Sequence, residues 1–208
     1  MGKIESYVKW ALDIAADDRH GYSQAVRWSP DYDCSSFVIS ALEAAGLPMR
    51  AYGATYTGNM GTALKACGFY RVNENARVNL DTGAGLVWGD ILLNPVTHTE
   101  IYIGDGRTVG AHGSETGGKY GKAGDQTGNE ISVQPYRNKN YTEVWRYGGN
   151  TLAFDPASSA NPYKDVARRV IRGDFGNGAD RIKALREAGY TIGKINQIQQ
   201  TVNHILRG

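Results

Sequence analysis

The fold of this chain is decided at residues 33–46, which read DCSSFVISALEAAG. The apolar residues of this stretch recur at helical spacing and predict the buried face of one helix: Phe37, Val38, Ala41, Leu42 and Ala45. Asp33 stands where an N-cap would stand, and Gly46 with Pro48 ends the helix. The sequence therefore places a cysteine, Cys34, in the first turn of a helix.

The position of Cys34 is typical of a nucleophile. A thiol attacks an amide only as the thiolate, and a helix N-terminus or a nearby imidazolium lowers the pKa of a thiol. The alternative is a small buried core residue, which is the commoner role of a lone cysteine. Cys67, which lies among Leu64, Ala66 and Phe69, is assigned that core role. A nucleophilic Cys34 would need a histidine partner.

The elements around this helix predict an α+β fold. Upstream, apolar residues at helical spacing predict a first helix: Ile4, Val8, Leu12 and Ala15. Residues 50–85 are rich in Gly and Asn, with one short helix expected around residues 61–68. Beyond them the pattern becomes that of short strands, at residues 86–93, 98–103, 107–112, 130–134 and 143–147. Helices followed by a run of strands predict N-terminal helices packed on an antiparallel sheet.

The sequence GDG at residues 104–106 predicts a hairpin between two of these strands. His98 and His112 lie seven residues on either side of the centre of this turn, so they should pair across the hairpin on one face. One imidazole could then orient the other, while that one activates Cys34. The long polar loop at residues 113–129 is typical of a segment that borders a binding cleft.

Three motifs carry a family resemblance: YDCSSFV at residues 32–38, WGDILL at residues 88–93 and THTEIYIGDGRTVGAHG at residues 97–113. Together they resemble the NlpC-type papain-like peptidoglycan hydrolases, most of all the phage-lysin branch, over roughly residues 5–147. The resemblance implies a papain-like domain with Cys34 as nucleophile and His98 as general base. It also implies that residues beside the nucleophile contact the substrate: Tyr22, Asp33 and Ser35.

The chain departs from the family pattern at two positions. The family usually has Gly where Glu100 stands, and its third polar residue usually falls at the position of Gly110, which cannot orient a base. His112 lies on the same strand face and is the nearest substitute as third catalytic residue. Glu115 is the reserve candidate for that role and is otherwise expected to contact the substrate.

The tail of the chain predicts a separate module. Residues 149–163, GNTLAFDPASSANPY, have no periodicity and are interpreted as a linker between a hydrolase domain at residues 1–148 and a module at residues 164–208. Apolar residues in the tail mark three short helices that would form a small bundle: Val166, Val170, Ile171, Ile182, Leu185, Ile195, Ile198, Val202 and Ile205.

Within this module, residues 166–190 carry a Gly-x-aromatic-Gly-x-Gly motif followed by Arg181, Leu185 and Ala-Gly-Tyr. The motif resembles the Cpl-seven-type cell-wall-binding repeat of phage lysins. The resemblance implies wall binding through Asp174, Phe175 and Arg181. An aromatic face can stack on a sugar, and an Arg fork can hold a carboxylate. The alternative is that Phe175 belongs to the core. Because one copy implies weak binding, self-association would be a source of valency.

Charge and composition limit the partners. The 23 Lys+Arg and 21 Asp+Glu are nearly balanced, so the overall charge does not indicate a nucleic-acid partner. Residues 151–208 hold nine basic and five acidic residues, a net of +4, which leaves a net of −2 for the first 150 residues. A basic tail favours an anionic partner such as the cell wall, or is only a solvated face. The two cysteines lie in no CxxC or CxxH pair, and no metal or cofactor is expected.

The N-terminus lacks the apolar run of a secretory signal, and no stretch has the length of a membrane span. Together with the resemblance to phage lysins, this implies synthesis in the bacterial host cytoplasm and action on the cell wall, with no membrane partner. The expected function is that of an endolysin, hydrolysing a peptidoglycan amide. Two bonds are candidates for cleavage: the N-acetylmuramoyl–L-Ala link, and a bond in the stem peptide after D-Glu or D-Gln. The alternatives are a non-catalytic cell-wall-binding protein with a degenerate hydrolase domain, and a thiol enzyme of acyl transfer.

Overall fold

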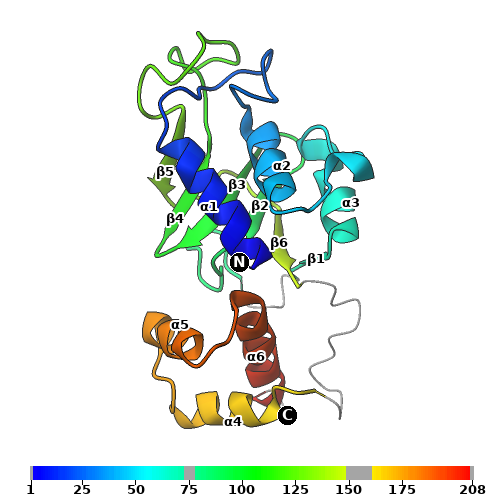
Figure 1. Ribbon diagram of the computed structural model, residues 1–208, viewed down its shortest axis with the longest axis vertical. Helices are drawn as coiled ribbons and strands as arrows, with labels where there is room; N and C mark the ends of the chain where they lie inside the picture. The colour runs from blue at the N-terminus through cyan, green and yellow to red at the C-terminus, as the bar shows by residue number, and fades with distance from the viewer. Residues whose placement is uncertain (1, 73–77, 149–160, 207–208) are drawn as a thin grey trace. The chain divides into compact units, whose positions relative to one another are not determined.

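The structure, a computed structural model, describes residues 2–72, 78–148 and 161–206 (Figure 1). The chain divides into two compact units, Lys3–Tyr147 and Gly148–Gly208, here called the N-terminal and the C-terminal unit. The linker expected at residues 149–163 lies outside the described residues up to residue 160, so its boundaries stay a prediction. Among the residues described, no helix combines the length and apolar character needed to span a membrane.

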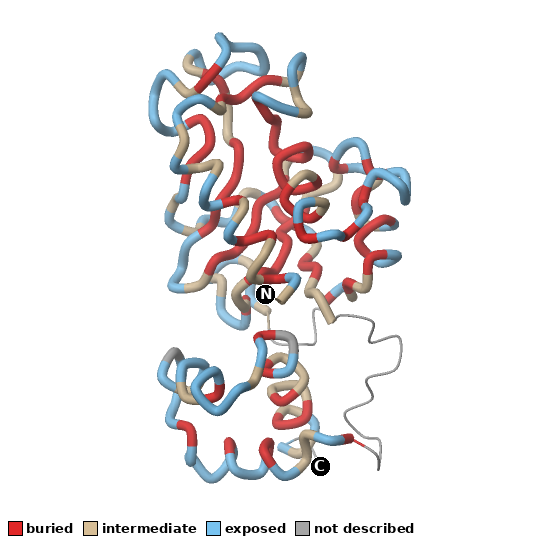
Figure 2. Tube along the Cα trace, in the orientation of Figure 1, coloured by how far each residue is buried: buried red, intermediate tan, exposed pale blue. Residues whose placement is uncertain are grey.

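The N-terminal unit packs helices on an antiparallel sheet of six strands, as predicted. Its helices are α1 (Lys3–Ala15), α2 (Cys34–Ala44), the 3-10 helix η1 (Arg50–Tyr52) and α3 (Thr57–Ala66). Its strands are β1 (Phe69–Arg71), β2 (Ile91–Asn94), β3 (His98–Gly104), β4 (Arg107–Ala111), β5 (Ile131–Pro135) and β6 (Glu143–Tyr147), in the spatial order β1-β6-β2-β3-β4-β5. Helix α2 packs on β3 and β4, and α1 packs on β4 and β5. Buried positions concentrate where these helices meet the sheet (Figure 2).

Helix α2 begins at Cys34, as its sequence predicts. The Asp33 carboxylate accepts a hydrogen bond from the Ser36 backbone N–H at 2.7 Å, and the Ser36 hydroxyl accepts one from the Asp33 N–H at 2.9 Å. This reciprocal capping box satisfies two amides that the first turn leaves without helical partners. The cap thus determines both where the helix starts and where the thiol lies.

The hairpin of β3 and β4 also forms as predicted. Ile101 pairs with Val109 and Tyr102 with Thr108, before the ladder shifts near Gly104. If this pairing continues away from the turn, Glu100 lies opposite Gly110. A Cβ placed on Gly110 would lie 2.8 Å from the Glu100 Cγ, so the missing side chain at residue 110 makes room for the one at residue 100.

The strand expected at residues 86–93 begins only at Ile91. Ahead of it the chain turns, because the Val87 N–H donates to the Asp90 carboxylate at 2.9 Å and the Asp90 N–H donates to the Val87 carbonyl at 3.0 Å. Gly89 within this turn has a φ of +89°, which strand residues do not adopt. The apolar residues of 86–90 therefore line a turn rather than a strand.

Two further expectations needed correction. The sequence does not predict the three-residue strand β1, because among the described strands it pairs with β6, more than seventy residues later in the chain. In α1 the buried face consists of Ile4, Tyr7, Val8 and Ala11, whereas Leu12 is 37% exposed. The buried stripe therefore lies one position earlier than the one drawn through Leu12 and Ala15.

The C-terminal unit consists, in its described part, of α4 (Lys164–Arg172), α5 (Gly178–Glu187) and α6 (Ile192–Ile205), as the sequence predicts. Helix α6 packs against both of the others. The core is apolar and small: Val166, Ala167, Val170, Phe175, Leu185, Ile192, Ile195, Ile198 and Val202. Ile171 and Ile182, expected to mark the helices, are exposed.

Replacing Gly89 with Ala should destabilise the N-terminal unit by about 3 kcal/mol or more, since strain and overpacking combine. The new Cβ would lie 2.3 Å from Ile4 Cγ2 and 2.6 Å from the Tyr7 hydroxyl. Gly53→Ala is the matched control, because φ is +86° there and nothing lies within 4 Å of the new Cβ. It should cost about 1 kcal/mol from strain alone. Urea unfolding measures both, and equal costs would contradict the packing argument.

Candidate functional site

Cys34 lies in a protected position at the start of α2. Its side chain is 8% exposed. Burial raises the pKa of the Cys34 thiol to about 11, and the negative charge of Asp33 adds to the effect. Hydrogen bonds from the backbone of Thr99 and Ser35 act in the opposite direction. The expected low thiol pKa is therefore wrong for the resting site, in which the sulfur holds its proton and needs a base to remove it.

Tyr22 interacts electrostatically with the residues at the start of α2, and its expected contact with substrate stays a prediction. Burial raises the pKa of the Tyr22 hydroxyl, a hydrogen bond with Gln24 opposes this shift, and the negative charge of Asp33 adds to it. The backbone of Tyr22 is held by the buried Glu130 carboxylate, which accepts its N–H at 2.9 Å. Buried Asp31 likewise accepts amides from Gly21 at 2.8 Å and from Gly124 at 3.1 Å. Two buried carboxylates thus tie the Tyr22 segment to the loop at residues 113–129.

Asp33 and Ser35 flank Cys34 but are already engaged within the protein. The Arg27 guanidinium pairs with the Asp33 carboxylate, with Nε 2.9 Å from Oδ2. Another Arg27 nitrogen donates to the Ser35 hydroxyl at 2.7 Å and to the Thr55 carbonyl at 2.6 Å. The Ser35 hydroxyl in turn donates to Asp33 at 2.9 Å. Both residues therefore support the turn at Cys34, and a contact with substrate stays a prediction.

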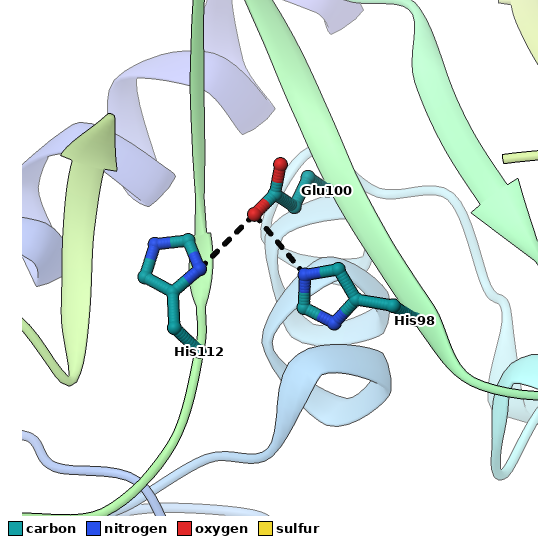
Figure 3. A group of neighbouring side chains, drawn as sticks. All are labelled: His98, Glu100 and His112. Carbon is teal, nitrogen blue, oxygen red and sulfur yellow. Dashed lines mark hydrogen bonds and ion pairs between the residues drawn. The ribbon is translucent and has the colours of Figure 1, made fainter. Parts of the chain in front are cut away.

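Three side chains from the hairpin converge beside α2 (Figure 3). His98 Nε2 lies 3.1 Å from Oε1 of Glu100, and His112 Nδ1 lies 3.0 Å from the same oxygen. The two imidazole rings are 6.2 Å apart, centre to centre. The histidines share the hairpin face that the sequence predicts, but the contact between them runs through Glu100. In the part of the chain that the structure describes, no direct hydrogen bond joins His98 to His112.

The Glu100 carboxylate is buried, with 0% of its side chain exposed. Lys139 Nζ donates to Oε1 at 2.6 Å, and the Tyr141 hydroxyl donates to Oε2 at 2.7 Å. Burial alone would raise the pKa of Glu100, but hydrogen bonds from His112 and His98 and the charge of Lys139 outweigh it. The pKa of Glu100 is therefore held well below its usual range, and the group is an anion.

This anion determines where the proton of His98 lies. An ionised carboxylate only accepts hydrogen bonds, so the His98 Nε2 that faces it carries a hydrogen. In the neutral ring, Nδ1 then has the free lone pair of a base. Stacking of the His98 ring on Tyr141, with centres 6.3 Å apart, also limits its rotation. Glu100 and Tyr141 thus set both the tautomer and the orientation of His98.

His112 has a different set of partners. Its Nε2 lies 3.2 Å from the Ser132 carbonyl, which can only accept, so Nε2 carries a hydrogen. Its Nδ1 lies 3.2 Å from Lys139 Nζ. In the neutral ring Nδ1 accepts from Lys139, and in the cationic ring it donates to Glu100. The described contacts place His112 behind Glu100 and not directly on His98.

Glu100 is the site residue that sequence reasoning missed. The sequence alone shows that Glu100 departs from the family pattern, and that Gly110 lacks the polar side chain of that pattern. The structure joins the two observations, because the carboxylate of residue 100 fills the space that a side chain at residue 110 would occupy. Glu115, the reserve candidate, accepts the Lys122 backbone N–H at 3.2 Å within its own loop.

The same three residues form a group of metal-ligand type. His98, Glu100 and His112 each offer one ligand atom, and these atoms lie within 4.8 Å of one another. The sequence does not predict such a group, because zinc motifs are recognised by ligands that lie a few residues apart in one segment. Here the hairpin brings together residues of two strands.

In the C-terminal unit, the residues expected to bind the wall are engaged in its own structure. Phe175 is 8% exposed, and the Arg169 guanidinium covers its ring at 4.8 Å. The expectation of an open stacking face is therefore corrected in favour of the core role. Arg181 donates to Gly176, Asn177 and Gln199. Asp174 pairs with Arg169 and Arg172 at 3.2 Å each.

Glu100 should make the stability of the N-terminal unit depend on pH. Because its folded pKa is depressed, its contribution is complete above the unfolded pKa of about 4.3 and is lost as pH falls through the folded value. The Gln side chain of a Glu100→Gln variant cannot titrate, so its unfolding free energy should decrease less steeply as the pH is lowered. Urea unfolding of both proteins between neutral pH and strong acid measures this. Parallel pH profiles would show that Glu100 is not the anion described.

Comparisons with known proteins agree with the motifs. Residues 19–109 match the family described as Endolysin-like domain, and residues 164–206 match the CW_7 repeat. No curated protein sequence matches the chain. Among solved structures, the peptidoglycan hydrolase RipB from Mycobacterium tuberculosis matches at 17% sequence identity and a TM-score of 0.44, covering 69% of this chain. The chain spans 64% of that structure's length, which is less than two thirds. By sequence, then, the chain is similar to an endolysin-like domain over residues 19–109 and to a CW_7 repeat over residues 164–206.

Proposed function

We propose that this protein is an endolysin that hydrolyses an amide bond of peptidoglycan with Cys34 as nucleophile and His98 as general base. The observation that carries the proposal is the meeting of α2 and β3, one bearing the cysteine at its first turn and the other the histidine. The backbone of Thr99, the residue after His98, is close enough to the Cys34 thiol to lower its pKa. The similarity to an endolysin-like domain covers both residues.

The reaction follows from the proton positions. His98 Nδ1 takes the proton of the Cys34 thiol as the sulfur attacks the carbonyl carbon of the scissile amide. Collapse of the tetrahedral intermediate breaks the C–N bond, and the proton on Nδ1 passes to the leaving amine. A thioester on Cys34 remains. Water then attacks it while Nδ1 accepts a proton, and the carboxylic acid leaves as the thiol is restored.

In this mechanism Glu100 is the positioning residue. Its negative charge stabilises the imidazolium that forms when His98 takes the thiol proton, and its hydrogen bond keeps the correct tautomer. Lys139 and Tyr141 hold the carboxylate in place through their hydrogen bonds. His112, which the sequence favours for this role, supports Glu100 from the far side. Which of the two candidate bonds is cleaved remains part of the test.

A non-catalytic cell-wall-binding protein is the second candidate. The observation that favours it is the burial of Cys34 and the raised pKa of its thiol, both typical of an inert cysteine. The arrangement of His98 and Glu100 favours catalysis, since a paired imidazole with one free nitrogen can remove the proton that burial retains.

Wall binding is proposed for the C-terminal unit on the strength of the CW_7 match and the net charge of +4 over residues 151–208. The acidic groups of a cell wall would meet exposed guanidinium groups on α4, among them Arg168 and Arg172. Phe175 would act as the core residue that holds α4 against the rest of the unit.

Cys34→Ala should abolish digestion of purified peptidoglycan, with a loss on the order of 10⁴-fold or more, because no other group can form the thioester. Cys67→Ser is the matched control and should keep the activity. Mass spectrometry of the released fragments identifies the bond that is cut. If Cys34→Ala digests walls as fast as the natural chain, Cys34 is not the nucleophile. If neither protein digests them, the binding protein is the better assignment.

Glu100→Gln should lower the rate by about 10²- to 10⁴-fold, because the amide can donate to His98 Nε2 and favour the wrong tautomer. The pH profile of kcat/KM should also shift, which a purely structural role would not produce. A Glu115 orienting role predicts the reverse, with the loss confined to Glu115→Gln. Assays of both variants on one muropeptide across pH decide between them.

Phe175→Leu should keep binding to sedimented walls, whereas Phe175→Ala should lose it together with the folding of the C-terminal unit. Leucine fills much of the core volume but has no aromatic face. Residues 1–148 alone should retain chemistry on soluble muropeptides and slow on whole walls. Loss of wall binding in a folded Phe175→Leu variant would restore the stacking role to Phe175.

A further inference from the structure

The group of His98, Glu100 and His112 has properties that the proposed hydrolysis does not require. We propose that it is also a reversible site for a divalent transition metal such as Zn²⁺, which competes with the Lys139 ammonium and switches the hydrolase off. The binding rests on the geometry of the group alone, whereas the inhibition rests on the proposed function.

The three ligand atoms are already close to metal geometry. His98 Nε2 and His112 Nδ1 lie 3.1 and 3.0 Å from Glu100 Oε1, and all three atoms lie within 4.8 Å of one another. Ligands of a tetrahedral Zn²⁺, bound at about 2.0–2.1 Å, lie about 3.4 Å apart. Two histidines and one carboxylate are also a known donor set of zinc sites that keep an open fourth position. Small side-chain movements therefore suffice to admit the ion.

The partners behind these ligands suit a metal as well. Histidines that bind metals usually donate their other ring N–H to a carbonyl or carboxylate, which directs the lone pair at the ion. His112 has this arrangement, with Nε2 3.2 Å from the Ser132 carbonyl and Nδ1 directed at Glu100. The second oxygen of Glu100 accepts the Tyr141 hydroxyl at 2.7 Å, which fixes the carboxylate while leaving Oε1 for the ion.

Lys139 already places a positive charge in this position. Its Nζ lies 2.6 Å from Glu100 Oε1 and 3.2 Å from His112 Nδ1. The ammonium and a divalent ion repel each other and need the same lone pairs, so they exclude each other. The side chain of Lys139 is 32% exposed, so it can turn into solvent when the ion enters. The lysine thus tunes the metal affinity of the site downward and keeps binding reversible.

Metal binding would disable His98 through its tautomer. In the free enzyme Nε2 carries the hydrogen and Nδ1 has the lone pair that receives the Cys34 proton. An ion on Nε2 needs that lone pair, so the hydrogen moves through solvent to Nδ1 while the ring stays neutral. Nδ1 then has no lone pair for the thiol proton. Inhibition would follow even with Cys34 itself untouched.

Equilibrium dialysis of the full chain with Zn²⁺, and the visible absorption of Co²⁺ as a spectroscopic substitute, test the site directly. The natural chain should bind one ion with the intense bands of tetrahedral Co²⁺. Lys139→Met should tighten binding by about 10-fold or more, because the competing charge is gone. Glu100→Gln should weaken it by at least about 10-fold, through loss of the anionic ligand. His204→Gln, which alters an exposed histidine of the other unit, is the control and should bind as the natural chain does.

The metal site is wrong if neither the natural chain nor Lys139→Met binds one ion at submillimolar concentrations, or if Lys139→Met binds no more tightly. A Glu100→Gln variant that fails to fold leaves Lys139→Met to decide, since that side chain is partly exposed. Inhibition of the hydrolase by Zn²⁺, and reversal of that inhibition by EDTA, test whether the metal switches the enzyme off. Binding without inhibition overturns the switch alone. A metal-free chain that digests no peptidoglycan overturns the proposed function, while the dialysis still decides the metal site.

Discussion

A buried carboxylate that must stay ionised organises the site of this protein. Glu100 has no exposed surface, and an isolated charge in that position would be strongly unfavourable. It is tolerated because four polar groups lie within hydrogen-bond distance of it: the two imidazoles on the hairpin, the Lys139 ammonium and the Tyr141 hydroxyl. Each donor is held in place by the same anion that it stabilises. The hairpin register, the tautomer of His98 and the position of Lys139 are therefore parts of one electrostatic arrangement.

The parts of this arrangement that sequence could reveal are those that depend on local rules. The N-cap at Asp33 and the apolar face after it predict the helix start at Cys34, and the turn at residues 104–106 predicts the side on which His98 and His112 lie. Both signals act within about twenty residues of chain. The resemblance to a known family supplied the order of the motifs and the role of His98.

The parts that sequence could not reveal depend on contacts between distant segments. Lys139 and Tyr141 reach Glu100 from the segment before β6, and no local pattern connects them to the hairpin. The strand β1 exists only because β6 pairs with it, and the turn ahead of β2 depends on the side chain of Asp90. Phe175 could equally have been a core or a surface residue, since only packing decides. Burial of Cys34 likewise reversed the pKa shift expected from the helix terminus alone.

The close approach of Glu100 to Gly110 links the histories of these two positions. Any side chain at residue 110 would overlap the Glu100 Cγ, at 2.8 Å from the first added carbon. A side chain at residue 110 is therefore tolerated only in company with a smaller one at residue 100, which is epistasis imposed by a single cross-strand contact. A side chain at residue 100 thus excludes one at residue 110, so exchanging a polar group between the two strands requires passing through a crowded or an empty intermediate.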